Sequence, residues 1–258
     1  MEGVSVAGFD GFIEQLSLMS EERISVPRDF DMGLGFESFG VRLVLEADDP
    51  DLLSKARETV FKAFGRRVKI FEDEKRRNGR SFGVDYSQGL YRLYKDGVEI
   101  SAGASERNFF KYLNSALRLE VAEFAQDHVF IHAGVVGWNG KAVILPGTSF
   151  AGKSTLTAEL VKHGAEYYSD EYAVIDPDGM VKPFPRDISM RYFGATREKD
   201  VTPESLGGTQ GTNPIPVGMV LFTNFQKGTT WSPEILSPGV GIMEMIPNTL
   251  TFRKDPAF

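Results

Sequence analysis

The sequence predicts an α/β protein in two parts, with a boundary near residue 126. After residue 128, short apolar runs typical of strands follow one another: HVFIHAGVV, KAVILPG, AEYYSD and YAVID. A glycine-bracketed loop and a helical pattern from Lys153 to His163 separate the second run from the third. Before the boundary, a hairpin signal lies between two longer helical patterns. These observations predict a smaller α+β region over residues 1–126, followed by an α/β domain over residues 127–258.

Composition limits the classes of protein to which the chain can belong. Its 258 residues suffice for one large domain or two of ordinary size. A net charge of -7 removes the positive potential that non-specific nucleic-acid binding requires, so we expect no nucleic-acid partner. The absence of cysteine excludes disulfides, thiolate metal sites and a catalytic thiol. No leader-like start and no 18-residue apolar run occurs, which favours a cytoplasmic protein without membrane contact.

The N-terminal region contains a predicted strand, two helices and a hairpin. Alternating apolar residues in GVRLVLEA predict a strand, and DDPDLLSKARETVFKAFG predicts a helix that ends at Gly65. The pair Asp96-Gly97 between alternating segments predicts a hairpin. SERNFFKYLNSALRLEVAEFAQD predicts a helix capped by Ser105. We assign its apolar stripe to the core rather than to a partner-binding face: Phe109, Leu113, Leu117 and Val121.

Four other stretches carry weaker signals. The first forty residues show no clear period and stay unassigned. The mixed charges at residues 72–80 predict a solvated loop rather than an anion site, although they include Lys75, Arg76, Arg77 and Arg80. Residues 194–218 are rich in Gly, Pro and Thr and predict a long functional or mobile loop. The end, NTLTFRKDPAF, shows no closing helix, so we expect a short C-terminal part.

The loop after KAVIL matches the phosphate-loop pattern G-x-x-x-x-G-K-[ST] at every fixed position. Its residues are Gly147, Thr148, Ser149, Phe150, Ala151, Gly152, Lys153 and Ser154, with Thr155 next along the helix. The strand before it and the helix after it provide the context in which backbone amides and a helix N-terminus face a phosphate. Lys153 is expected to neutralise β- and γ-phosphate charge, and the Ser154 hydroxyl to ligate Mg²⁺. The alternative is an incidental glycine-rich turn between strand and helix.

An acidic pair, Asp170-Glu171, lies 17 residues beyond Lys153. That distance accommodates one helix, a glycine stop and a short strand that returns beside the first. A right-handed crossover then brings the acids next to the loop. There Asp170 and Glu171 are expected to ligate the metal or accept a proton from an attacking hydroxyl. The alternative is two exposed acids at the end of a strand.

His132 lies in the strand-like run FIHAGVV, 15 residues before Gly147. If this strand neighbours KAVIL, the imidazole is placed to steady charge on a transferred phosphate. Otherwise it is an ordinary core or edge histidine. The chain contains no N-K-x-D motif of a GTPase. SLGGTQ at residues 205–210 is similar to the transporter ATPase signature, but it follows the acidic pair instead of preceding it, so we treat it as a coincidence.

His132, the loop and the acidic pair have the order and spacing of the catalytic domain of HPr kinase/phosphorylase, which this chain resembles over residues 128–180. The resemblance implies a P-loop nucleotide-binding domain of HPr-kinase type, related to the nucleotide domain of phosphoenolpyruvate carboxykinase. It implies that Asp170 is the base for a serine hydroxyl and that His132 assists at the phosphate. It also implies that Lys153 and Ser154 hold ATP and Mg²⁺.

The chain differs from the bifunctional enzymes at several positions. Thr155 stands where they usually carry an acid, Glu171 replaces an aspartate, and Ala133 replaces a glycine. PFPRDISMRYFG occupies the place of their E-[IV]-R-G signature and offers Arg186 or Arg191 as a phosphate contact. The chain is more similar to the HPr-kinase-like proteins of bacterial biosynthetic clusters, some of which phosphorylate a serine of a precursor peptide. We therefore leave the phosphorylase activity out of the prediction.

The leading hypothesis from the sequence is an ATP- and Mg²⁺-dependent kinase that transfers the γ-phosphate to a serine of a protein or peptide acceptor. The N-terminal region or residues 195–218 are expected to present that acceptor. One alternative is a nucleotide-binding regulatory module without turnover, and another is a small-molecule phosphotransferase, including a carboxykinase-like activity. A homo-oligomer is compatible with the sequence.

Overall fold

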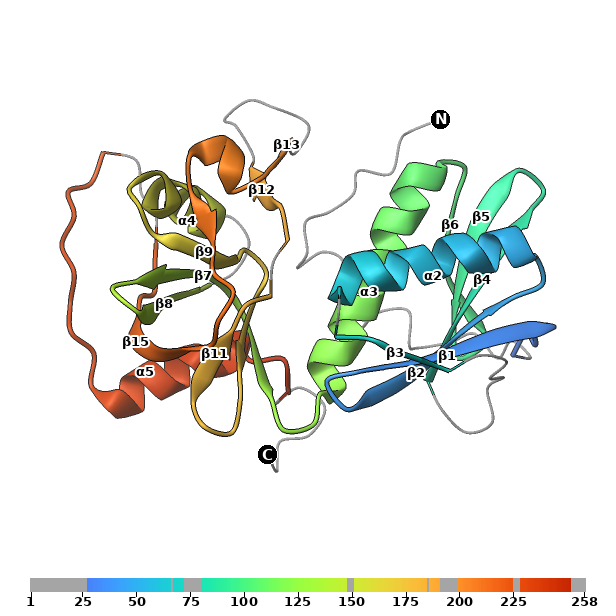
Figure 1. Ribbon diagram of the computed structural model, residues 1–258, viewed down its shortest axis with the longest axis horizontal. Coiled ribbons are helices and arrows are strands. Elements are labelled where there is room, and N and C mark those ends of the chain that lie inside the picture. Colours follow the sequence, from blue (N-terminus) through green and yellow to red (C-terminus); the bar gives the residue numbers. More distant parts are fainter. Residues whose placement is uncertain are drawn as a thin grey trace. The chain divides into compact units, whose positions relative to one another are not determined.

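The computed structural model describes residues 27–65, 67–71, 80–147, 151–184, 186–190, 199–224 and 228–251, and it is a mixed α/β protein (Figure 1). Four α-helices and three sheets lie in these residues. The chain splits into two compact units, Met1–Gln126 and Asp127–Phe258. None of the described helices is long and apolar enough to span a membrane.

The N-terminal unit is a six-stranded sheet with two helices. Its sheet has the order β3-β1-β2-β4-β5-β6, and every neighbouring pair is antiparallel except β2 and β4. Helices α2 and α3 pack against each other and against the sheet (Figure 1). The elements are β1 (Met32–Ser38), β2 (Val41–Ala47), α2 (Pro50–Phe64), β3 (Lys69–Phe71), β4 (Arg80–Ser87), β5 (Leu90–Lys95), β6 (Val98–Gly103) and α3 (Glu106–Phe124).

Local sequence explains both helices of this unit. The Asp49 side chain accepts the amides of Asp51 and Leu52 at the start of α2, and Gly65 ends the helix with a φ of 59°. Ser105 caps α3 by accepting the amide of Asn108. The predicted stripe of α3 is buried, so its assignment to the core is confirmed: Phe109, Leu113, Leu117 and Val121.

For this unit the hairpin prediction is confirmed, the solvated-loop prediction is wrong at Arg80, and two strands, β1 and β3, were not predicted. Asp96 and Gly97 have φ values of 52° and 84° and join β5 to β6 as the predicted hairpin. Arg80 belongs to β4 and pairs with Glu120 at 3.0 Å, whereas the rest of the charged stretch, residues 72–79, lies outside the described residues. The sequence does not identify strand β1, because MGLGFES is buried on both faces and therefore shows no alternation of polar and apolar residues.

The C-terminal unit is built around β7, which pairs with three other strands. β7 is antiparallel to β8 on one side; on its other side it is antiparallel to β10 along its first half and to β9 along its second half. The elements are β7 (Val129–Trp138), β8 (Lys141–Pro146), α4 (Lys153–Lys162), β9 (Glu166–Ser169), β10 (Tyr172–Ile175), β11 (Met180–Lys182), β12 (Ile188–Met190), β13 (Lys199–Val201), η1 (Glu204–Leu206), β14 (Thr209–Gln210), β15 (Ile215–Val220), α5 (Pro238–Met245) and η2 (Ile246–Asn248).

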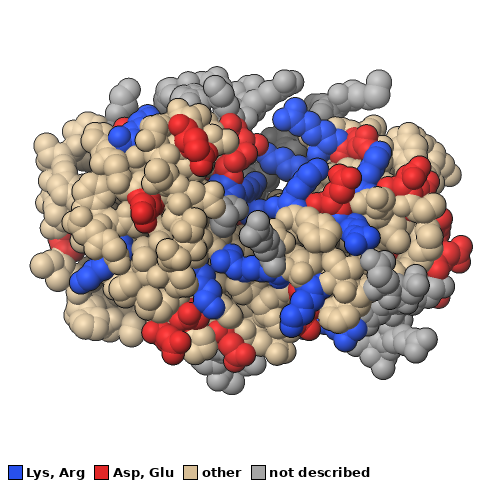
Figure 2. All heavy atoms as spheres, in the orientation of Figure 1, with Lys and Arg blue, Asp and Glu red and all other residues tan. Residues whose placement is uncertain are grey.

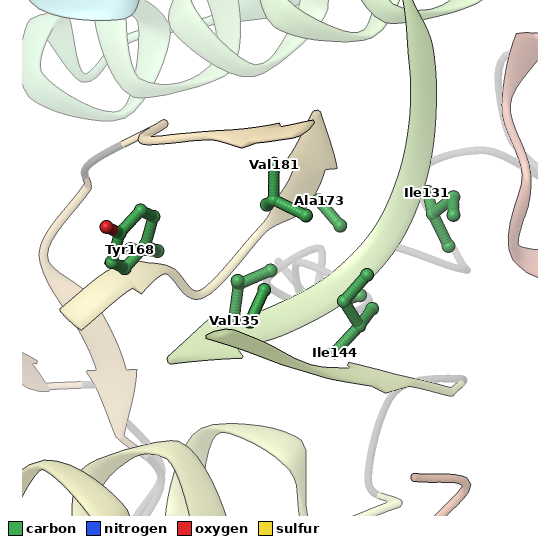
Figure 3. Close-up of a cluster of buried hydrophobic side chains, with 8 residues drawn as sticks. Ile131, Val135, Ile144, Tyr168, Ala173 and Val181 are labelled. Atoms are coloured by element: carbon green, nitrogen blue, oxygen red, sulfur yellow. The ribbon is translucent and has the colours of Figure 1, made fainter. Parts of the chain in front are cut away.

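Five of these strands form a closed ring of pairings, β7-β8-β15-β11-β10 and back to β7. A cluster of buried apolar side chains fills this part of the unit (Figure 3), and its labelled members are Ile131, Val135, Ile144, Tyr168, Ala173 and Val181. The opposite face of β7 packs against α4 through a second cluster that includes Val136, Ala158 and Val161. β7 therefore lies between two cores, one on each of its faces.

The expectation of one long loop over residues 194–218 is wrong for its described part. β13, η1, β14 and the start of β15 lie there. Gly208 and Gly211 pack so closely on Val161 and Tyr168 that an added Cβ would overlap these side chains. The glycines that make SLGGTQ similar to the transporter ATPase signature therefore allow close packing, with the short strand β14 beside β9. Helix α5 was also not predicted, and residues 252–258 of the C-terminal end lie outside the described residues.

Candidate functional site

The phosphate-loop segment and the acidic pair follow two parallel strands. The loop leaves β8 after Pro146, and the pair follows β9 after Ser169. Because both strands are antiparallel to β7, their carboxyl ends point the same way. The prediction that the second strand returns directly beside the first is wrong, since β7 lies between them. The two segments nevertheless meet at one edge, as Lys153 and the Ser154 hydroxyl both influence the Asp170 carboxylate.

The described ends of the loop join the strand β8 to the helix α4. Gly152 has a φ of 89°, a conformation that a residue with a side chain adopts only at a cost, and α4 begins directly after it. Among the described residues, no side chain caps this helix N-terminus, where backbone amides lack partners within the helix. Lys153 is buried and its Nζ donates to the Gly147 carbonyl at 2.6 Å. Thr148, Ser149 and Phe150 lie outside the described residues.

The start of α4 separates the two hydroxyl residues that follow the lysine. Ser154 is half-buried on the side of Asp170, whereas Thr155 is exposed. The Ala151 carbonyl, just before the helix, accepts a hydrogen bond from the Thr223 hydroxyl at 3.1 Å. Thr223 follows β15, the parallel neighbour of β8. Sequence reasoning missed this contact; the apolar run IPVGMVLF could have indicated the strand, but the pattern does not show which loop the strand leads to.

Asp170 has the environment of a functional carboxylate. Part of the residue is exposed, but its Oδ1 is shielded from solvent and has no hydrogen bond of normal geometry among the described residues. Oδ2 accepts the Ser189 amide at 3.1 Å. Burial raises the pKa of Asp170 to about 7, although Ser189, Ser154 and the neighbouring cations act to lower it. An incompletely satisfied buried carboxylate of this kind is a candidate ligand or base.

Glu171 has a different partner from the one predicted. Its Oε2 lies 3.1 Å from Nη1 of Arg186, and the side chain is buried. Glu171 is the main cause that raises the pKa of Arg186, and the Arg186 carbonyl accepts the Tyr167 hydroxyl. Arg186, offered as a phosphate contact, thus holds the second acid. Arg191, the other candidate, lies outside the described residues.

His132 lies in β7, which neighbours β8, as a role of its imidazole at the phosphate requires. In the register of β7, Ala133 is opposite Pro146, so His132 is level with the start of the loop. On the other side His132 pairs with Tyr172, and the two rings lie 6.4 Å apart edge to face. Gly134, on the same face of β7, packs closely on Thr157 of α4. The histidine therefore lies on the α4 side of the sheet.

The residues present fit a magnesium–nucleotide site better than a metal site made of protein alone. Among the described residues, no group of three or more His, Asp or Glu side chains could hold a metal. Mg²⁺ bound with a nucleotide needs only one or two protein oxygens because phosphate oxygens and water supply the rest. Ser154 and Oδ1 of Asp170 are such oxygens. Comparison of the chain with models of protein families, with curated proteins and with solved structures gave no match.

Proposed function

We propose that this protein is an ATP- and Mg²⁺-dependent kinase that transfers the γ-phosphate to a serine hydroxyl of a protein or peptide acceptor. The observation that carries the proposal is the convergence of the Ser154 hydroxyl and the buried Asp170 carboxylate beside Lys153. These groups come from the start of α4 and from the end of β9. A phosphate cradle with a single under-satisfied carboxylate next to it is suited to phosphoryl transfer, where positioning and charge do most of the work.

Each group has a defined part in the proposed reaction. The amides at the start of α4 and the Lys153 ammonium bind the β- and γ-phosphates. Ser154 and Oδ1 of Asp170 would hold Mg²⁺, which would supply charge neutralisation when bound with the nucleotide. Asp170 accepts the proton of the acceptor hydroxyl while that oxygen bonds to the γ-phosphorus and the bond to the bridging oxygen of ADP breaks. His132, level with the start of the loop, steadies the charge on the transferred group.

The HPr-kinase type of the domain is part of the proposal. It is supported by the sequence resemblance and by the placement of its three motifs on β7, β8 and β9. A peptide or protein acceptor follows from that resemblance. Glu171 is paired with Arg186, whereas the Ser154 hydroxyl acts on Asp170, which supports one catalytic carboxylate rather than two equivalent ones.

Incubation of the protein with γ-labelled ATP, Mg²⁺ and a cell extract, followed by mass spectrometry, tests the proposal. We expect label on a serine of a protein or peptide, and at least about 100-fold slower labelling with the Lys153→Ala variant. Binding of ATP without transfer to any acceptor would favour the regulatory module. Label on a small molecule alone would favour the small-molecule phosphotransferase. Absence of ATP binding rejects the nucleotide assignment itself.

A further inference from the structure

A long apolar segment of the C-terminal unit, residues 231–246, is exposed to solvent; we call it the arm. Among the described residues, none of α5 is buried, although the helix is almost entirely apolar. Trp231 is 73% exposed, Ile242 60% and Met243 67%. The other large apolar side chains exposed on the arm are Ile235, Leu236, Val240 and Ile246. Exposed apolar surface of this extent on one segment indicates an interaction site.

Both ends of the arm are attached to its own unit. It follows β15, and at its far end Met245 packs against the core of the unit. Beyond η2, Thr249 bridges to Ile131, and the Leu250 amide donates to the Phe130 carbonyl at 2.9 Å. Helix α5 has only eight residues, and isolated helices of this length are unstable in water. The helix therefore depends on packing against other residues, and within its own unit this packing is given by Met245 and by η2.

The size and charge of the arm define the class of its partner. Seven large apolar side chains at these exposures present on the order of 800 Å², the area that each partner contributes to a standard protein interface. Glu234 and Glu244 are the only charged residues of the arm. Nucleic acid and anionic membranes bind through Lys and Arg, which the arm lacks. The surface thus fits another protein.

A second exposed apolar surface, which we call the β15 strip, lies on the strand that precedes the arm in the sequence. Val217 and Met219 of β15 are 39% and 54% exposed although β15 lies between β8 and β11 in the sheet. Figure 2 shows few charged side chains over the side of this unit where β15 and α5 are labelled in Figure 1. Each chain therefore adds two exposed apolar side chains of β15 to the apolar surface of the arm.

We infer that the arm is an interface between two copies of this chain. A second copy supplies apolar surface matched in size and lack of charge, because it carries the same arm and the same β15 strip. Two arms buried at once give an interface of the standard total size. The inference does not depend on the proposed kinase activity, so either can fail without the other.

Sedimentation velocity of the full chain tests the association. We expect a dimer or larger species at micromolar concentration. The double variant Ile242→Glu, Met243→Glu should weaken association by at least about 100-fold, because two charges would be buried in an apolar interface. Phe61→Glu, at an exposed apolar residue of α2, is the matched control and should leave association unchanged. A wild-type chain that stays monomeric over this range overturns the inference.

A cross-linking experiment identifies what covers the arm. Because the chain has no cysteine, Met243→Cys provides a single thiol for a photoreactive maleimide. We expect a product with twice the mass of the chain, with cross-links to the arm or to β15 of the other copy. Phe61→Cys should give little of it. A product with the mass of one chain, or cross-links in an extract only to other proteins, contradicts the inference.

Discussion

In each unit of the protein one carboxylate has an oxygen shielded from solvent and without a hydrogen bond of normal geometry among the described residues, but the two carboxylates differ in the cations paired with them. In the N-terminal unit, Glu120 of α3 is buried but bonded to two cations, Arg80 of β4 and Lys95 of β5. In the C-terminal unit, Asp170 accepts one backbone amide, and its Oδ1 has no hydrogen bond of normal geometry among the described residues. Charge neutralisation removes the cost of burial from Glu120, whereas Asp170 retains it.

We interpret this difference as one between a carboxylate that serves the fold and one that, in the proposed function, serves chemistry. Glu120 links a helix to two strands through its ion pairs with Arg80 and Lys95. Asp170 lies at the end of β9 beside Ser154, and its raised pKa measures the burial that its neighbours do not offset. A carboxylate with such a raised pKa is a candidate functional group, so we place the candidate site in the C-terminal unit.

The largest expected effect is the loss of phosphoryl transfer in Asp170→Asn. Removal of the base should lower the transfer rate by about 10²- to 10⁴-fold while ATP still binds. Asp187→Asn, the same change at an exposed position three residues before Met190, is the control and should keep its rate. Single-turnover kinetics with labelled ATP measures both. A rate for Asp170→Asn within a few-fold of wild type excludes Asp170 as the base.

At pH 8, neutral substitutions of the two carboxylates should change the free energy of unfolding in opposite directions. The pKa of Asp170 is about 7 in the folded protein and near 3.8 when unfolded, so the folded state binds the proton more tightly. The proton bound to Asp170 therefore stabilises the folded state fully below pH 4. This stabilisation, about 4 kcal/mol in total, is lost as the pH rises through 7. Asp170→Asn should remove this dependence and stabilise its unit at pH 8.

Glu120→Gln should instead destabilise the N-terminal unit, by on the order of 2 kcal/mol, because Arg80 and Lys95 lose their partner. Denaturant unfolding of both variants at pH 5 and pH 8 gives the two changes. Destabilisation by both substitutions at pH 8 would show that Asp170, like Glu120, serves the fold.

A smaller effect, about 10²- to 10³-fold on transfer, is expected for Lys153→Ala. The ammonium that holds the loop through the Gly147 carbonyl is then missing when phosphates bind. Lys162→Ala is a matched control on the same helix, since its side chain is exposed and contacts only Glu159 in the described contacts. Calorimetric titration with ATP and a transfer assay compare them, and unchanged affinity and rate in Lys153→Ala would reject the phosphate loop.

The smallest effect is expected at Thr223, whose hydroxyl donates a hydrogen bond to the loop at the Ala151 carbonyl. Thr223→Val removes one hydrogen bond to the Ala151 carbonyl, and a net loss of about 1 kcal/mol corresponds to roughly fivefold weaker ATP binding. Thr223→Ser keeps the hydroxyl and should bind like wild type. Equal affinities for all three proteins would mean that the loop needs no support from β15.

Much of the fold could be predicted because local sequence patterns determine where several elements begin, end or turn. The caps at Asp49 and Ser105, the stop at Gly65 and the Asp96-Gly97 hairpin act over a few residues, so local pattern suffices. β1 could not be assigned, since burial on both faces depends on what packs against it. The elements within residues 199–218 were hidden for a related reason: their glycines suggest a loop, but they allow close packing on neighbours distant in sequence.

For the candidate site, the sequence by itself determined the residue types and their order: a histidine in a strand, a loop with Lys153 and Ser154, and an acidic pair. Only the tertiary structure decided the neighbours of each. It inserted β7 between β8 and β9, paired Glu171 with Arg186 and brought Ser189 to Asp170. Motif spacing is fixed along the chain, but burial and ion pairing arise from residues far apart in sequence, so two adjacent acids acquire different roles only when the chain has folded.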